Sequence, residues 1–290
     1  MAETMGILGP AGTHSEAAAL YLNRRLKEPR RLVIYSDIYD VLQAVTEHEV
    51  DEALVPVENS LEGAINITLD VLACSTMLSV ERELIWPVHN LLMAKCQPAE
   101  VRRIYSHSQP ISQCRVFLET QYPDVEIVKV ASTARAAEIV GDLPATDGAA
   151  AICTARGGEL NGLKLLAADV QDNMANSTRF YQLRPRQTLP PGRSPEQPDR
   201  ELIICQIAGQ KAGALCEVLM EFARRNVNLT RIESRPARTE LGEYIFFFDL
   251  ECEPGREQIR EDAIAAVAQR CIWLKNLGAF PVIAAEEDTA

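Results

Sequence analysis

Near its N-terminus the chain reads Met5-Gly-Ile-Leu-Gly-Pro-Ala-Gly-Thr-His-Ser-Glu16, an apolar run followed by a glycine-rich turn and a helix start. Thr13 and Glu16 have the spacing of a capping box, in which side chains satisfy the first free N–H groups of a helix. The helical pattern predicted from this start covers residues 15–26. A strand, a short turn and a helix are the beginning of a βαβ unit, so this stretch favours an α/β fold.

The same alternation continues along the first two thirds of the chain. Strand-like apolar runs occupy residues 5–8, 32–35, 52–57 and 149–153, with helical patterns between them. We therefore expect an α/β domain with a largely parallel sheet. With 290 residues and 47% apolar content, the chain has room for about two domains.

A proline-rich segment separates this part from the rest. We predict a linker over residues 185–199, because its prolines can neither continue a helix nor pair in a central strand: Pro185, Pro190, Pro191, Pro195 and Pro198. The first domain then covers residues 1–184 and the second residues 200–286. In the second, the order of patterns is strand, helix, strand, strand, helix, with residues 280–283 as a final strand that could close the sheet. This βαββαβ order predicts a ferredoxin-like domain.

Composition narrows the classes of partner. A net charge of −12 disfavours nucleic acid and anionic lipid surfaces, and the short basic cluster at residues 24–31 suits a solvated helix end. No apolar run reaches 18 residues, and no secretion signal opens the chain, so we expect a cytoplasmic protein without a membrane partner. Eight scattered cysteines and four separated histidines lack the spacings of a disulfide framework or a metal site, so no metal and no cofactor are expected.

Further helix starts follow other predicted strands. Capping patterns occur at Asn59-Ser-Leu-Glu62, at Ser106-His-Ser-Gln109 before Pro110, and at Ser132. Each cap alone is explained by helix formation. Taken together, helix N-termini at the carboxyl ends of strands predict a cleft that holds a small anionic ligand.

The first glycine turn also permits a dinucleotide site. Gly6, Gly9 and Gly12 lie between a strand and a helix, and Asp37 follows the second strand. The missing central glycine pair and the presence of Pro10 disfavour close approach of a pyrophosphate, and no other segment suggests hydride transfer.

Six motifs carry a resemblance to a known family. In the first domain these are Gly9-Pro-Ala-Gly-Thr-His-Ser-Glu-Ala17, Val55-Pro-Val-Glu-Asn-Ser-Leu-Glu-Gly63, Ser106-His-Ser-Gln-Pro-Ile-Ser-Gln-Cys114 and Asn176-Ser-Thr-Arg-Phe180. They resemble, in order, the signatures of prephenate dehydratases. Gly213-Ala-Leu215 and Asn228-Leu-Thr-Arg-Ile-Glu-Ser-Arg-Pro236 resemble the effector motifs of the regulatory ACT domain of this family. The resemblance covers nearly the whole chain, and nothing before Gly6 suggests the chorismate mutase domain that is fused to some relatives.

The resemblance implies a fold, a reaction and a set of site residues. The catalytic domain would be two-lobed, like periplasmic binding proteins, and would decarboxylate and dehydrate prephenate to phenylpyruvate. Thr178 matches the family's essential threonine and would hydrogen-bond the leaving oxygen. The residues expected to contact the substrate are Asn59, Ser60, Gly63, Arg179, Thr13, Ser15, Gln109 and Phe180. Arg179 could also be a structural clamp, since strand neighbours point to opposite faces.

The resemblance also implies control by phenylalanine. The effector would bind between two ACT domains in a homodimer or homotetramer, at Gly213, Ala214, Leu215, Asn228, Leu229, Glu233, Ser234, Arg235 and Pro236. His14, Ser108 and Pro110 depart from the usual motifs. Arogenate dehydratase and a non-catalytic amino-acid or solute-binding protein stay open as alternatives.

Overall fold

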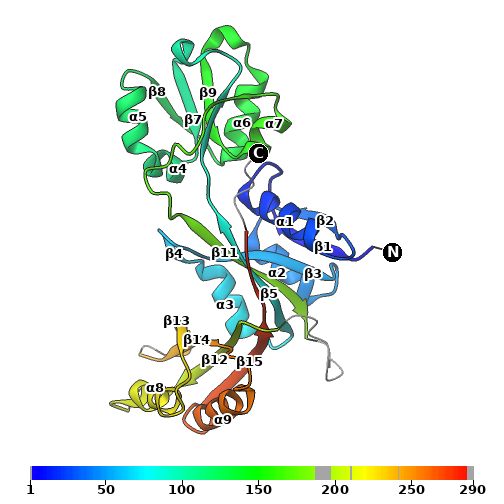
Figure 1. Ribbon diagram of the computed structural model, residues 1–290, viewed down its shortest axis with the longest axis vertical. Coiled ribbons are helices and arrows are strands. Elements are labelled where there is room, and N and C mark those ends of the chain that lie inside the picture. Colours follow the sequence, from blue (N-terminus) through cyan, green and yellow to red (C-terminus); the bar gives the residue numbers. More distant parts are fainter. Residues whose placement is uncertain (1, 187–196, 210, 241, 286–290) are drawn as a thin grey trace.

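The computed structural model describes residues 2–186, 197–209, 211–240 and 242–285, arranged around three sheets along one long axis (Figure 1). The upper sheet and all but one strand of the middle sheet belong to the N-terminal domain, and the lower sheet belongs to the C-terminal domain. Within the described residues no helix is long and apolar enough to cross a membrane.

The middle sheet contains strands from both ends of the chain. Its order is β16-β5-β11-β3-β1-β2, with β4 paired to β3. The bounds are β1 (Thr4–Leu8), β2 (Arg31–Tyr35), β3 (Glu52–Asn59), β4 (Gly63–Ala64), β5 (Leu78–Pro87), β11 (Ser177–Pro185) and β16 (Val282–Ala284). Its helices are α1 (His14–Arg25), α2 (Ile38–Thr46) and α3 (Asn66–Cys74).

The upper sheet has the order β10-β6-β9-β7-β8. Its strands are β6 (Leu91–Ala94), β7 (Arg103–Ser106), β8 (Glu126–Lys129), β9 (Ala149–Cys153) and β10 (Lys164–Ala167). Its helices are α4 (Ser108–Gln113), α5 (Arg115–Gln121), α6 (Thr133–Asp142) and α7 (Ala155–Leu160), with short 3-10 turns at Pro98–Glu100 and Ala145–Asp147. The chain enters this lobe after β5 and returns into β11, so two segments connect the lobes.

The expectation of a largely parallel sheet was wrong, because both sheets are mixed. β1 pairs in parallel with β2 and β3, but β11 runs antiparallel between β3 and β5. In the upper sheet β7 pairs in parallel with β8 and β9, whereas β6 is antiparallel to β9 and β10. The antiparallel strands are those that carry the chain between the lobes.

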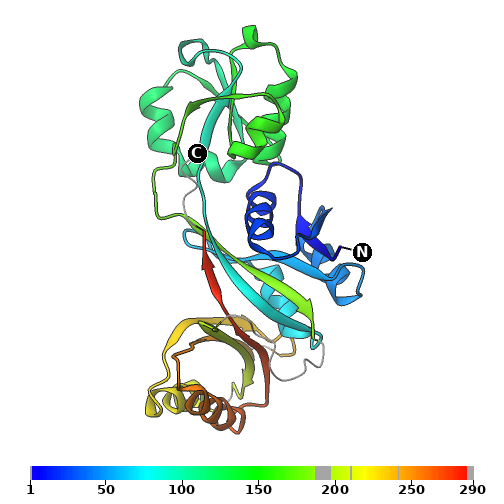
Figure 2. The same ribbon diagram turned by 45° about the vertical axis from the view of Figure 1, so that its right-hand side comes forward.

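The C-terminal domain has the predicted ferredoxin-like topology. Its strand order is β13-β14-β12-β15, and two helices cover one face of the sheet. The bounds are β12 (Arg200–Ile207), α8 (Ala214–Arg224), β13 (Leu229–Pro236), β14 (Tyr244–Glu251), α9 (Glu257–Ala268) and β15 (Trp273–Phe280). The predicted last strand was wrong, because β15 closes this sheet, and residues 282–284 instead form β16 beside β5 of the middle sheet (Figure 2).

The uncovered face of the C-terminal sheet packs on the N-terminal domain. Leu202, Ile204 and Phe247 share one buried core with Val80 and Tyr181 of the middle lobe. This shared core fixes the two domains against each other. The predicted linker at 185–199 falls mostly outside the described residues and stays a prediction; Pro185 itself ends β11.

Candidate functional site

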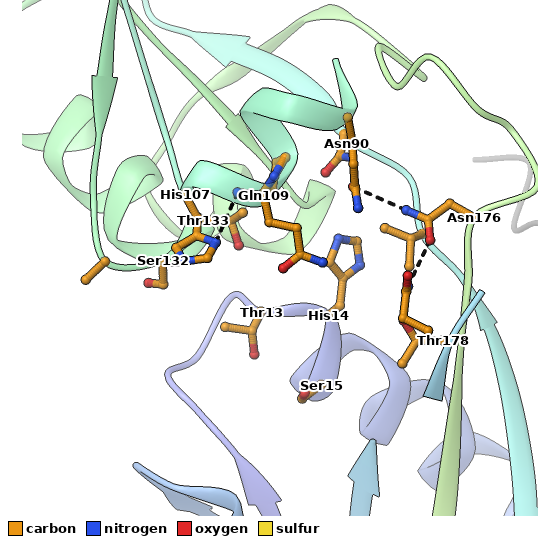
Figure 3. Close-up of a pocket in the computed structure, with 15 residues that line it drawn as sticks. Thr13, His14, Ser15, Asn90, His107, Gln109, Ser132, Thr133, Asn176 and Thr178 are labelled. Atoms are coloured by element: carbon orange, nitrogen blue, oxygen red, sulfur yellow. Dashed lines mark hydrogen bonds between the residues drawn. The ribbon is translucent and has the colours of Figure 1, made fainter. Parts of the chain in front are cut away.

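A cavity of about 280 Å³ lies where the two lobes of the N-terminal domain meet (Figure 3). Its lining comes from α1, β3, β11, α4, α6 and the two segments that connect the lobes. The lining residues are Thr13, His14, Ser15, Asn59, Val88, Asn90, His107, Gln109, Pro110, Gln113, Ala131, Ser132, Thr133, Asn176 and Thr178. The cavity is therefore a cleft between lobes, as the converging helix starts predicted.

Thr178 lies at the lower wall, beside Asn59 on the neighbouring strand. The two residues are paired in the register of β3 and β11, and Asn59 Nδ2 lies 3.1 Å from Thr178 Oγ1. The same amide group donates to Asn176 Oδ1 at 2.8 Å. Because Thr178 Oγ1 accepts from Asn59, its own hydroxyl proton is free to point into the cavity. The pair thus presents an oriented hydroxyl donor to a bound ligand.

Asn59 is held from its other side as well, and here a sequence prediction was wrong. Its Oδ1 accepts from the backbone N–H groups of Leu61 and Glu62 at 3.0 and 3.2 Å, but these residues form a turn between β3 and β4 rather than a helix. Helix α3 begins later, at Asn66, without a side-chain cap. An Asn side chain satisfies free N–H groups equally well in a tight turn, so the capping pattern was ambiguous.

The other helix starts do reach the cavity. Thr13 caps α1 and Ser132 caps α6, accepting from Glu16 N at 3.4 Å and Arg135 N at 3.0 Å. Glu16 bonds Gly12 N at 2.6 Å instead of the N-cap residue, so the predicted capping box is a variant one.

For α4 the cap is His107, whose Nδ1 accepts from Gln109 N at 3.4 Å. The prediction of Ser106 as the cap was wrong, because Ser106 is buried in β7 and donates to Ile152 O. The N-cap residues Thr13, His107 and Ser132 all line the cavity, so the N-terminal ends of three helices face it.

Charge is absent from this lining. Among the described residues around the cavity there is no Lys, Arg, Asp or Glu. The polar groups are amides, hydroxyls and imidazoles. A ligand with negative charge would be held by helix N-termini and neutral donors rather than by ion pairs. Elsewhere in the described residues, no three His, Cys, Asp or Glu side chains gather as a metal site.

The predicted substrate contacts fall into two groups. Thr178, Asn59, Thr13, Ser15 and Gln109 line the cavity, and their contact with substrate stays a prediction.

Ser60, Gly63, Arg179 and Phe180 do not line it. Ser60 bonds Ala175 O and Ser177 N across the turn, and Gly63 is exposed with φ 82°. Phe180 is 1% exposed in the core beneath α1, so its expected contact with substrate does not fit its placement.

Arg179 points to the face of β11 opposite Thr178. Its guanidinium lies 2.6 Å from Asp249 and 3.2 Å from Glu83, with Glu58 at 3.7 Å. Burial opposes its charge, but the neighbouring carboxylates outweigh that effect and raise its pKa. The position of Arg179 therefore fits a structural clamp and does not fit a contact with substrate.

Three amide residues were not singled out from the sequence. Asn90 and Asn176 both donate to Gln113 Oε1, at 3.4 and 3.2 Å, which ties the two connecting segments to α4. Asn176 and Gln113 stood inside recognised motifs, but Asn90 carried no pattern of its own. The three residues meet because the two connections run side by side next to the end of α4.

The predicted effector residues lie in the C-terminal domain. Gly213, with φ 82°, is the N-cap of α8, which contains Ala214 and Leu215. Asn228 precedes β13 and donates to Glu251 at 2.8 Å. The rest lie on the edge strand β13: Leu229, Glu233, Ser234, Arg235 and Pro236. Arg235 points at the N-terminal domain, where its guanidinium binds Asp70 of α3 at 3.1 and 3.3 Å.

Comparison with known proteins agrees with this geometry. The family model "Prephenate dehydratase" matches residues 5–188, and the ACT domain model matches residues 203–267. The chain belongs to the prephenate dehydratase family. This confirms the recognition made from the motifs, and the two-lobed α/β domain followed by a ferredoxin-like ACT domain is confirmed with it.

Individual relatives cover most of the chain. A prephenate dehydratase of Amycolatopsis methanolica is 38% identical over 94% of this chain and 86% of its own length. One from Lactococcus lactis is 35% identical over 84% of this chain and 85% of its own. A crystal structure of the Arthrobacter aurescens prephenate dehydratase in complex with L-Phe has a TM-score of 0.82 and 32% identity, covering 96% of this chain and 90% of that one.

The same fold also occurs in GqqA, described as a novel type of quorum quenching acylase, with a TM-score of 0.79 and 25% identity over 96% of this chain and 98% of that one. Fold likeness alone therefore does not give the reaction, which depends on the residues that line the cavity.

Proposed function

We propose that this chain converts prephenate into phenylpyruvate in the cavity between its lobes. The observation that carries the proposal is the Thr178 and Asn59 pair: one hydroxyl donor, oriented by an amide, in a cavity whose described lining has no charged side chain. Family membership supports prephenate as the substrate, and the placement of Thr178 and Asn59 in the cavity supports their role.

The reaction needs positioning more than it needs a nucleophile. The C–CO₂ bond breaks, its electron pair enters the ring, and the C–O bond at the opposite ring carbon breaks with loss of hydroxide, which becomes water on protonation. The products are phenylpyruvate, CO₂ and water. The Thr178 hydroxyl would donate a hydrogen bond to the departing oxygen, where negative charge develops.

The uncharged lining suits the departing carboxylate. That group loses its charge as CO₂ forms, so a cation fixed beside it would stabilise the reactant more than the transition state. Hydroxyls, amides and helix N-termini can orient both carboxylates without that penalty.

We also propose that phenylalanine regulates the activity through the ACT domain, as a homodimer or homotetramer in the cytoplasm. The support is the ACT match and the L-Phe complex of the Arthrobacter relative. An effector can act only through different affinities for two states, a coupling of typically 1–3 kcal/mol.

The test is phenylpyruvate formation from prephenate by the purified chain, with and without L-phenylalanine. Thr178→Val keeps the side-chain shape and removes the hydroxyl, so turnover should fall at least 100-fold. Thr120→Val, on the exposed surface of α5, is the matched control and should leave it unchanged. If the wild-type chain is inactive on prephenate but active on arogenate, the proposed substrate changes to arogenate. Inactivity on both compounds would refute the proposal.

A further inference from the structure

His14 is the first residue of α1, and its side chain projects into the middle of the cavity. In Figure 3 its ring lies between Gln109 on one side and Asn176 with Thr178 on the other. In the motif that residues 9–17 resemble, this position usually has an aromatic residue such as Phe or Tyr. The proposed reaction so far gives it no role.

The hydrogen bond to Trp86 fixes the tautomer of His14. The indole Nε1–H of Trp86 lies 3.4 Å from His14 Nδ1, and an indole nitrogen can only donate. Nδ1 must therefore accept, so the ring proton is on Nε2. Burial, with a smaller effect of His89, lowers the pKa of His14 to about 4, so the ring is neutral at physiological pH.

The Nε2–H group of His14 is a buried donor without an acceptor. It is one of the few buried side-chain atoms among the described residues that have no hydrogen-bond partner. Glu83 and Arg231 supply most of the others, and these belong to a charged cluster between the domains.

The remaining unpaired atom is Asn90 Oδ1, which belongs to the same cavity as His14. Buried polar groups of native proteins are nearly always paired, so two unpaired groups in one cavity call for a ligand that pairs them.

We infer that His14 Nε2–H donates a hydrogen bond to an oxygen of the bound substrate. The substrate class follows from the chemistry of the donor: carboxylate, keto and hydroxyl oxygens accept a hydrogen bond, whereas an ammonium group cannot. The inference rests on the proposed function for the identity of the substrate. It adds a direct contact from an imidazole at this position of the cavity.

The test compares two substitutions of His14. His14→Phe keeps the ring and removes the donor; His14→Gln removes the ring but places an amide N–H close to the position of Nε2. Loss of a hydrogen bond to a charged or developing-charge oxygen predicts a drop of at least tenfold in kcat/KM for prephenate in His14→Phe. His14→Gln should stay within about threefold of the wild type.

His48 provides the matched control. It lies in the turn after α2 with φ 62°, a conformation that Asn tolerates, so His48→Asn should leave kcat/KM unchanged. Urea unfolding of each variant separates a loss of contact from a loss of folded protein.

Equal losses in His14→Phe and His14→Gln, or a loss below threefold in His14→Phe, would overturn the inference even with an active wild type. A wild type without turnover on prephenate would instead contradict the proposed function, so the two failures are distinguishable.

Discussion

Replacing Arg179 by Met should cost the protein about 3–5 kcal/mol of unfolding free energy, because Arg179 is a central cation of a buried charge cluster. The cluster joins three arginines, Arg179, Arg200 and Arg231, to three carboxylates, Glu58, Glu83 and Asp249. Side chains of Glu83 and Asp249 are fully buried, so their charges depend on these partners.

The magnitude follows from what remains after the substitution. Met fills much of the space of Arg179, but two buried carboxylates then lose the cation that lies 2.6 Å from one and 3.2 Å from the other. In the wild type, burial already raises the pKa of Glu83 against the opposing effect of Arg179 and Arg200. Without Arg179 that pKa should rise further.

The sign of the pH dependence follows. A carboxyl whose folded pKa is raised above its unfolded value loses stability as the pH rises through that interval. The deficit of Arg179→Met relative to wild type should therefore be larger at pH 8 than at pH 5. Urea unfolding followed by the fluorescence of Trp86 and Trp273, one in each domain, measures it.

Arg115→Met is the matched control, since Arg115 and Glu119 form an exposed pair on α5, where solvent screens the attraction and little stability should be lost. A second variant, Arg179→Met with Glu83→Gln, removes one of the two buried carboxylates that lost this cation and should recover part of the loss. A deficit for Arg179→Met below about 1 kcal/mol, equal at both pH values, would refute the account of the cluster.

Two further predictions concern the lobe contact and the domain contact. Gly12 has φ 85°, and a Cβ there would meet Gly157 Cα of the other lobe at 2.9 Å. Gly12→Ala should therefore raise KM for prephenate at least tenfold in steady-state kinetics. An unchanged KM would contradict the close lobe contact. Lys275 donates to the carbonyls of Leu72, Ala73 and Ser75 at the end of α3, and burial lowers its pKa to about 8. Between pH 8 and about 10.5 the Lys275 amine is protonated in the unfolded chain but not in the folded one. The free energy of unfolding of the wild type should therefore rise relative to that of Lys275→Met across this interval, by at most about 3 kcal/mol. A difference that stays constant with pH would contradict this prediction.

Local signals in the sequence predicted much of the fold. The capped helix expected over residues 15–26 is α1, and the caps at Thr13 and Ser132 are present. Strand direction was not predictable, because the alternation of apolar residues is the same in parallel and antiparallel strands. An apolar run also does not say which strand it will pair with. The sequence of residues 280–283 therefore could not reveal that β16 pairs with β5 of the middle sheet.

The site was predictable only where one residue carried its own signal. Thr178 and Asn59 stand in recognised motifs, and both reach the cavity. Asn90 had no such signal and enters the cavity because the two connections between the lobes run side by side there. Arg179 was ambiguous in the sequence, since its strand position excludes the face of Thr178, while its partner Asp249 is 70 residues away.

The alternation of β3 and β11 links the cavity to the ACT domain. Asn59 and Thr178 form one register pair and face the cavity; Glu58 and Arg179 form the next pair and meet Arg231 and Asp249 of the ACT sheet on the opposite face. A movement of β13 and β14 would therefore act on Glu58 and Arg179, which are the chain neighbours of Asn59 and Thr178. The register between β3 and β11 is irregular directly after Arg179, so the ladder of hydrogen bonds is interrupted next to this pair. A small shift at Thr178 would alter the proposed hydrogen bond to the departing oxygen, so the proposed control by the ACT domain requires no separate signal path.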